Sequence, residues 1–241
     1  MWKKNIIYDV EIEAITGLHI GGLNDQLRIG GVDSSVIKTY MTYRDSSEGR
    51  WTVEVPYIPG SSIKGKIRSL LLTAYGERVI KSKGNAEDVE FSDDALKHMF
   101  GVPSKNTSEG SSQKIDRTRL ITRDAFPKIE EVEELLRENS LYEIKGENKI
   151  NLFTGKAENP RFIERIRPGV KFYGNFILQI MDNDDEDLMD RYLKEGIEML
   201  NDSYLGGNGS RGYGKVKVTI TSKKEKTLED YKIIEENQED E

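Results

Sequence analysis

Residues 6–14 read Ile6-Ile7-Tyr8-Asp9-Val10-Glu11-Ile12-Glu13-Ala14, with apolar side chains at every even position and acids at 9, 11 and 13. Because successive side chains of a strand point to opposite faces, this alternation predicts a strand with one buried face. The segment 170–181 repeats the pattern, and its apolar residues share one face: Val170, Phe172, Phe176, Leu178 and Ile180.

Two amphipathic helices and two further strands complete the pattern. A helix is predicted from about 61 to 76, behind Pro59-Gly60, with a hydroxyl N-cap from Ser61 or Ser62. A second is predicted over 184–201, ended by Gly206-Gly207, and strands are predicted over 117–123 and 215–220. The order strand, helix, strand, strand, helix, strand is that of the ferredoxin-like βαββαβ unit, which also builds the RNA-recognition fold. We therefore expect an α+β fold.

The remaining segments are less regular. The sequence predicts a hairpin over 40–54 with its turn at 45–49, and a short helix over 93–100 that stops at Gly101. It predicts a serine- and glycine-rich loop over 104–112 and an irregular excursion with a short acidic helix over 129–160. One domain is expected over 1–222, followed by a charged, flexible tail over 223–241.

Composition excludes several classes of site. Cysteine is absent, which excludes disulfides and cysteine-ligated zinc. His19 and His98 are the only histidines, which excludes a histidine-rich metal site. No apolar run is long enough to span a bilayer, and the first residues lack a signal-peptide core, so a cytoplasmic protein without a membrane partner is expected.

The net charge of −7 does not exclude nucleic acid, because binding depends on local fields rather than on the sum. Much of the acid is concentrated in three runs, at 130–134, 182–187 and 235–241. The basic residues cluster elsewhere, so a basic face is expected beside an acidic one.

The predicted start of the first long helix carries Lys64, Lys66 and Arg68. Free amides at a helix N-terminus, the positive end of the helix dipole and these cations would together bind an anion such as phosphate. The alternative is an ordinary capped helix with solvated lysines. The segment is not a Walker A motif, since its Gly-Lys-Ser/Thr ending is missing.

The run 204–216 holds five glycines, which allow a backbone to approach a ligand closely. Arg211 and Lys215 supply charge, and Tyr213 offers a ring for stacking on a base. The alternative is a plain turn between helix and strand. The length and positive charge of the run favour a function.

Arg117, Arg119 and Arg123 would share one face of a strand and suit a phosphate backbone. The alternative is a surface strand paired with Asp116 and Asp124, and the residues alone do not decide between the two.

His19 lies between Gly17 and Gly21-Gly22, and Asp33 follows Gly30-Gly31. Either could contact a ligand. A lone histidine is more often packed, and a lone aspartate on a glycine loop is usually a turn residue, as Asp25 and Asp45 also could be.

Seven segments together resemble the RAMP superfamily, specifically the backbone subunit of the type III-A CRISPR (Csm) effector complex. They occur in the right order between about residues 10 and 220, at 17–22, 29–34, 57–65, 119–125, 147–151, 157–165 and 207–214. The resemblance implies a ferredoxin-like palm, a lid-like insertion near 80–115 and a thumb within 125–165 that wedges between bases. It implies partners: a guide CRISPR RNA, a target RNA, further copies of the chain in a filament and other Csm subunits.

The same resemblance implies a cleavage of target RNA by Asp33 with a divalent metal, Mg²⁺ or Mn²⁺, to which Asp33 would be a weak ligand shared with RNA phosphate. His19 would bind the guide. The remaining expected RNA contacts are Gly21, Gly22, Ser34, Lys38, Ser61, Ser62, Lys64, Lys66, Arg68, Arg119, Arg123, Phe153, Gly207, Gly209, Ser210, Arg211, Gly212 and Tyr213.

The chain departs from the family pattern after Asn151, where Leu152-Phe153-Thr154 stands in place of an expected arginine. Phe153 would then stack as the wedge, or Lys149 and Lys156 would supply the missing charge.

Four other readings stay open at this stage. The chain could be a RAMP scaffold that binds RNA without cutting it, or a guide-precursor ribonuclease that relies on general acid–base residues. It could be a structural ferredoxin-like subunit without RNA, which predicts no salt-dependent retention of RNA. A nucleotide-binding enzyme fits least, because neither glycine segment has the required spacing.

Overall fold

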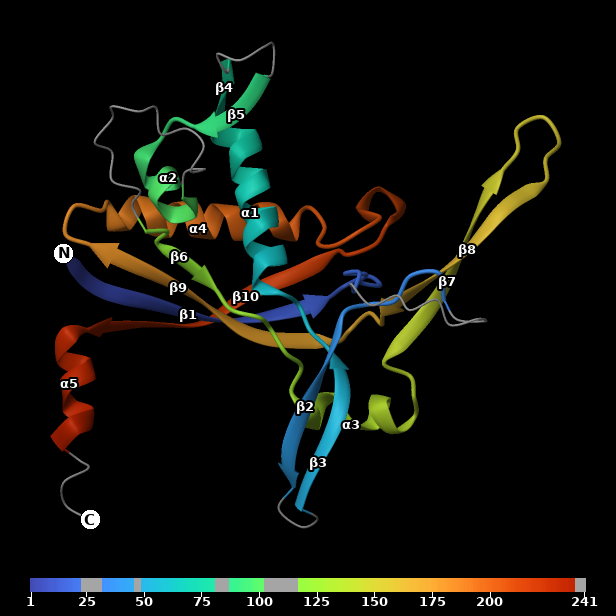
Figure 1. Cartoon of the computed structure of the whole chain (residues 1–241), viewed down its shortest axis with the longest axis horizontal. Coiled ribbons are helices and arrows are strands. Elements are labelled where there is room, and N and C mark those ends of the chain that lie inside the picture. The colour runs from blue at the N-terminus through green and yellow to red at the C-terminus, as the bar shows by residue number, and fades with distance from the viewer. Residues whose placement is uncertain (23–31, 46–48, 81–86, 102–116, 237–241) are drawn as a thin grey trace.

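A four-stranded antiparallel sheet forms the centre of the computed structural model, which describes residues 1–22, 32–45, 49–80, 87–101 and 117–236 (Figure 1). The order across the sheet is β10-β1-β9-β6. These strands are β1 (Trp2–Ala14), β6 (Leu120–Thr122), β9 (Lys171–Met181) and β10 (Val216–Thr227). The first strand therefore lies between the third and the fourth, and the crossovers carry α1 (Gly60–Tyr75) and α4 (Glu186–Asn201). This is the ferredoxin-like βαββαβ arrangement, so the predicted fold class is confirmed.

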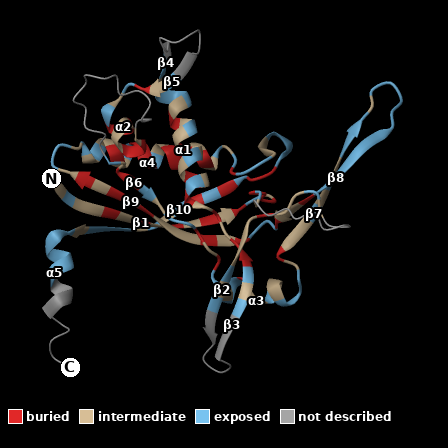
Figure 2. Ribbon diagram, viewed as in Figure 1, coloured by how far each residue is buried: buried red, intermediate tan, exposed pale blue. Residues whose placement is uncertain are grey.

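The core lies between one face of this sheet and the two long helices, as the buried residues in Figure 2 show. The even-numbered positions of β1 from 6 to 14 are buried, as predicted, and the odd-numbered positions between them are only partly buried. From the helix side, Ile67 of α1 and Ile197 of α4 are buried in the same core. The two helices meet at Gly196, where a Cβ atom would stand 2.5 Å from Ile67 Cγ2. The missing side chain lets the helices approach closely.

The starts of helices α2 and α1 are capped in different ways. The short helix α2 (Asp94–Phe100) lies where a helix over 93–100 was predicted, and Asp93 caps it by accepting hydrogen bonds from the amides of Ala95 and Leu96. Helix α1 lacks the cap that was predicted for it, because neither serine hydroxyl caps it. Its first amide, at Gly60, donates instead to Asp124 Oδ1 at 2.7 Å. That acceptor follows β6 and is distant in sequence, so the local pattern could not reveal it.

Three hairpins extend from this core. The first is the predicted one, β2 (Lys38–Asp45) with β3 (Gly49–Pro56), although its turn lies outside the described residues. The second pairs β4 (Gly76–Ile80), at the start of the insertion expected near 80–115, with β5 (Glu87–Phe91) inside it, and residues 102–116 are likewise not described.

The third hairpin corrects the expectation of an irregular excursion over 129–160. Helix α3 (Ile129–Arg137) is the predicted acidic helix, and behind it β7 (Tyr142–Ile150) pairs with β8 (Ala157–Ile166). Residues 148–150 and 157–162 are exposed, so much of this hairpin has no apolar alternation for sequence reasoning to detect.

The C-terminal segment agrees with expectation in part. Helix α4 ends at Asn201, the predicted last residue, and Gly206-Gly207 lies further along the chain rather than directly at the helix end. The chain after 222 has secondary structure that was not predicted, because β10 continues to Thr227 and is followed by α5 (Leu228–Glu236). The continuation pairs with the start of β1 and is tied to it by Lys4, whose ammonium lies 2.7 Å from Glu225. Among the described helices, none combines the length and apolar character that crossing a bilayer requires.

Arg119 is part of the core rather than of an arginine-lined surface. Its side chain is 3% exposed, and its Nε lies 2.7 Å from Asp184 Oδ2 at the turn before α4. The strand itself spans only 120–122, and Arg123 beyond it is exposed. The prediction of three arginines on one face is therefore wrong, because the partner of Arg119 comes from a segment 65 residues away.

We expect Arg119→Met to destabilise the protein by about 3–5 kcal/mol, because it leaves the Asp184 carboxylate buried without its counter-charge. Chemical denaturation of the full chain measures the loss. The control is Arg123→Met, which should change stability by less than about 0.5 kcal/mol. If Arg119→Met has the stability of the wild type but binds RNA more weakly, Arg119 contacts RNA and the assignment to the core is wrong.

Candidate functional site

Three segments that are distant in sequence meet beside the base of the β7–β8 hairpin. Leu18 and Ile166 of β8 exchange main-chain hydrogen bonds of 3.0 and 2.8 Å. The segment 18–22 also pairs with 34–37, through a bridge between Gly21 and Val36. Ser34 in turn bridges Ile163 of β8. The predicted histidine and aspartate segments are therefore brought together by backbone pairing.

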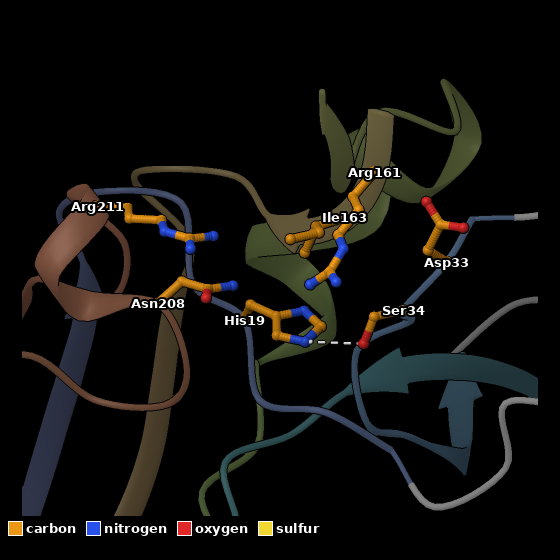
Figure 3. A pocket seen from close by; sticks show the side chains of 7 residues that line it. All are labelled: His19, Asp33, Ser34, Arg161, Ile163, Asn208 and Arg211. Atoms are coloured by element: carbon orange, nitrogen blue, oxygen red, sulfur yellow. Dashed lines mark hydrogen bonds between the residues drawn. The ribbon is translucent and has the colours of Figure 1, made fainter. Parts of the chain in front are cut away.

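These segments enclose a pocket of about 340 Å³ (Figure 3). It is lined by His19, Asp33, Ser34, Arg161, Ile163, Asn208 and Arg211. Four of these were predicted as site residues: His19, Asp33, Ser34 and Arg211. Sequence reasoning missed Arg161 and Asn208, although both lie within or beside segments that carried the resemblance.

Asp33 is exposed and held in place by the main chain of Phe162. Its amide donates to the Phe162 carbonyl oxygen at 2.9 Å, and its Oδ2 accepts from the Phe162 amide at 2.6 Å. Within the described residues, the other carboxylate oxygen, Oδ1, has no protein partner. The geometry thus fixes the carboxylate while keeping one oxygen available to a ligand.

His19 is 7% exposed, yet one ring nitrogen reaches the pocket. Its Nδ1 lies 2.7 Å from the carbonyl oxygen of Glu164. Because a carbonyl can only accept, Nδ1 carries the hydrogen. In the neutral ring Nε2 is then an acceptor, and Ser34 Oγ donates to it at 3.2 Å. The histidine is therefore a packed residue with one nitrogen directed at the site.

Glu164 holds the arrangement together, and sequence reasoning assigned it no role. Its carboxylate accepts from the amide of Val36 and from Lys38 Nζ, both at 2.9 Å, while its carbonyl binds His19. Lys38 was predicted to contact RNA. Its ammonium instead pairs with Glu164 and lies 4.2 Å from the centre of the Tyr142 ring, so its contacts are internal.

The glycine-rich run forms the opposite wall of the pocket. The Gly207 amide donates to the His19 carbonyl at 2.9 Å. At Gly206, φ is 77° and a Cβ atom would lie 2.2 Å from that same oxygen, so only glycine fits there. A 3-10 turn over Gly209–Arg211 then presents Arg211, whose guanidinium pairs with Glu147 of β7. The predicted contacts Gly209, Ser210 and Gly212 lie in or directly after this turn.

Tyr213 is a structural residue, contrary to the prediction that it stacks on a base. Its side chain is 1% exposed, and Lys145 and Arg165 lie over its ring, 4.3 and 4.5 Å from the ring centre. Burial raises the pKa of its hydroxyl to about 12, so the ring stays neutral. The cations on its faces come from β7 and β8, and Tyr213 therefore fixes the hairpin to the glycine-rich run.

The predicted anion site at the start of α1 is not formed as expected. Lys64 Nζ donates to the Leu120 carbonyl at 2.6 Å, and burial lowers the pKa of this amine. Lys66 lies 3.7 Å from the centre of the Tyr204 ring, and Arg68 lies over Phe91. Neither these cations nor Ser61 and Ser62 line the pocket that holds Asp33. The first amide of the helix is already occupied by the Asp124 carboxylate, which would repel a phosphate.

A second pocket, of about 530 Å³, extends from the first along the hairpin. It is lined by Glu147, Asn148, Lys149, Asn159, Arg161 and Arg211, and the two arginines line both pockets. Beyond it, at the hairpin turn, Phe153 is 100% exposed. The hairpin projects away from the sheet in Figure 1. Phe153 therefore lies apart from the pocket that holds Asp33.

Comparison with known proteins identifies the family. The RAMP superfamily matches residues 11–217. This chain belongs to the RAMP superfamily. Relatives named "CRISPR system Cms endoribonuclease Csm3" include one from Methanothermobacter thermautotrophicus, which is 37% identical over 96% of this chain and 90% of its own length. One from Streptococcus thermophilus is 37% identical over 90% and 88%, and one from Methanocaldococcus jannaschii is 36% identical over 89% and 79%.

A solved structure agrees in fold. It is a chain of a complex titled "Cryo-EM structure of the Type III-B Cmr-beta bound to cognate target RNA", with a TM-score of 0.51 and 18% identity. The match covers 93% of this chain and 61% of that one. The resemblance to the RAMP backbone subunit of the type III-A complex, inferred from seven short segments, is thus confirmed.

A metal at this RAMP site would need ligands from elsewhere. Among the described residues, no group of three or more histidines and acids is placed to hold an ion. Asp33 Oδ1 is the carboxylate oxygen at the pocket that remains for one. Magnesium commonly keeps several waters and shares phosphate oxygens, so the donor set fits an ion that the RNA helps to bind.

We expect Glu164→Gln to loosen the RAMP pocket, since the amide cannot pair with the Lys38 ammonium. Hydrogen exchange of the full chain should quicken in peptides covering 32–38 and 17–22, with a stability loss of about 1–3 kcal/mol. Glu158→Gln, an exposed position on the same strand, is the matched control. Unchanged exchange in both peptides would show that backbone pairing alone holds the site.

Proposed function

We propose that this chain is the guide-RNA-binding backbone subunit of a type III-A interference complex and cleaves complementary target RNA at regular intervals through Asp33. The observation that carries the proposal is the Asp33 carboxylate, fixed by Phe162 with one oxygen available, in a pocket lined by two arginines. The relatives named endoribonuclease Csm3 match nearly the whole chain and support cleavage of RNA.

The surface around Asp33 suits a phosphate backbone despite the net charge of −7. Arg161 and Arg211 line two adjoining pockets, and Lys149 and Asn148 continue them along the hairpin. Such groups bind phosphate and sugar and do not distinguish one base from another. The target sequence would therefore be recognised by base pairing between guide and target. His19 and the glycine-rich run would contact the strand that lies in the first pocket.

The cleavage chemistry follows from the available oxygen of Asp33. The 2′-hydroxyl of the target donates to Oδ1 and loses its proton there as the 2′-oxygen bonds to phosphorus. The bond between phosphorus and the 5′-oxygen breaks, and that oxygen takes a proton from solvent. The products are a 2′,3′-cyclic phosphate and a 5′-hydroxyl. A positioned general base contributes about 10²–10⁴-fold to such a step.

We also propose a divalent metal, Mg²⁺ or Mn²⁺, for which Asp33 and the RNA phosphate would both serve as ligands. It would neutralise charge on the phosphate when bound. Because Asp33 alone would hold it, its affinity in the absence of RNA would be low.

The hairpin β7–β8 would be the thumb. Phe153, fully exposed at its turn beside Leu152, would wedge between bases, with Lys149 and Lys156 supplying charge in place of the absent arginine. Copies of the chain would follow one another along the guide, in a cytoplasmic complex with other Csm subunits. Regular spacing of the cuts would then reflect the spacing of the copies.

The test is cleavage of a guide-complementary RNA by the reconstituted complex. Wild type with magnesium should give evenly spaced products, and Asp33→Ala or a chelator should slow cleavage by at least about 10²-fold while guide and target stay bound. Asp182→Ala, an exposed aspartate paired with the N-terminal amine, is the matched control. Target RNA that stays bound but uncut by the wild type would reduce the chain to a scaffold.

A further inference from the structure

Arg161 is a guanidinium without a counter-charge at the centre of the site. The residue is exposed, and within the described part of the chain its side chain takes part in no hydrogen bond or ion pair. The neighbouring guanidinium groups differ, since Arg211 pairs with Glu147 and Arg165 pairs with Glu143. Arginine stays protonated at all physiological pH values, so this charge remains for a ligand to neutralise.

The register of the hairpin makes the missing counter-charge informative. Glu147 stands directly opposite Arg161 across the β7–β8 pair, where residues of opposite charge usually interact. Its carboxylate instead pairs with Arg211. Asp33 does not neutralise Arg161 either, because no ion pair joins the two and one Asp33 oxygen accepts from Phe162. Both nearby acids thus leave Arg161 uncompensated.

The position of Arg161 relative to Asp33 is fixed by the backbone. The main chain of Phe162, the next residue, accepts a hydrogen bond from the Asp33 amide and donates one to the Asp33 carboxylate. Figure 3 shows the Arg161 side chain extending from β8 into the pocket, with its guanidinium toward the side formed by His19 and Ser34. If Asp33 binds a 2′-hydroxyl of the RNA, the phosphate next to that hydroxyl would therefore lie in the pocket that the Arg161 side chain enters.

We propose that Arg161 is a second catalytic residue, which binds a non-bridging oxygen of the scissile phosphate and stabilises the negative charge that accumulates there during cleavage. The inference rests on the proposed function of Asp33. As the 2′-oxygen attacks, the phosphate gains charge, and a planar guanidinium can offer two parallel N–H groups to its oxygens. A cation already in position needs no rearrangement at that moment, which is the source of large electrostatic effects on rate.

A purely binding role makes a different prediction. A cation that holds ground-state RNA and transition state equally affects affinity and leaves the saturating rate unchanged. The rate and the affinity must therefore be measured separately.

The experiment uses the reconstituted complex under single-turnover conditions with saturating target RNA. Arg161→Gln should lower the cleavage rate by about 10²–10³-fold. Target affinity should change by less than about tenfold, because guide pairing supplies most of it. Arg161→Lys should recover part of the rate. Arg137→Gln, which alters an exposed arginine of α3, should match the wild type.

A sulfur substitution at one scissile linkage gives a readout that a structural role would not change. In the wild type, one of the two phosphorothioate stereoisomers should be cut more slowly, because sulfur replaces the oxygen that Arg161 binds. In Arg161→Gln the part of that difference caused by Arg161 should be lost, so the ratio of the two cleavage rates should change.

The outcomes separate the two proposals. If the wild type cleaves and Arg161→Gln keeps its saturating rate, the inference fails and the proposed function stands. The same conclusion follows if the ratio of the cleavage rates of the two stereoisomers is unchanged in the variant. If the wild type does not cleave at all, both proposals fail.

Discussion

The one-sided burial of β1 is the constraint on which the rest of the structure depends. Its even-numbered residues from 6 to 14 form the centre of the core. A slip of β1 by one position against β9 and β10 would turn these residues to the other face of the sheet, so the register is fixed. The same register decides where the site can form. Ala14 at the end of β1 lies opposite Val216 at the start of β10, and Glu13 lies opposite Lys171 at the start of β9. The segments before and after these three strand ends therefore emerge side by side, and they are the histidine segment, the glycine-rich run and strand β8.

Sequence reasoning succeeded where burial of one face makes apolar residues recur at regular spacing. The strands of the sheet, both long helices and the short α2 helix that stops at Gly101 could be predicted from local pattern alone. It failed for β7 and β8, because a hairpin exposed along much of its length has no period to detect. It also failed at the start of α1, where the cap comes from Asp124, 64 residues away. Each failure concerns a contact or an exposure that only the folded chain defines.

The predicted site residues also fall into two groups, those that line the pocket and those that do not. Asp33, His19, Ser34 and Arg211 converge as the glycine-rich context suggested. Lys38, Arg119 and Tyr213 do not reach the pocket, because each is engaged by residues far away in sequence. Composition cannot distinguish a cation that binds a ligand from one that binds a neighbouring acid. Glu164 and Arg161 were missed because the neighbouring sequence does not show that an acid will bind several segments or that an arginine will have no ion pair.

Charge compensation explains how an acidic protein can present a basic site. Each of Glu143, Glu147 and Glu164 pairs with a cation near the pocket: Arg165, Arg211 and Lys38. Those cations fix the positions of strands and loops, and their fields are largely cancelled at a distance. Arg161 has no ion pair within the described residues, so its positive charge remains available to a ligand in the pocket that also holds the Asp33 carboxylate. Net charge therefore counts many paired groups that hold the structure together, whereas a ligand responds to the charged groups that remain unpaired at its own binding site.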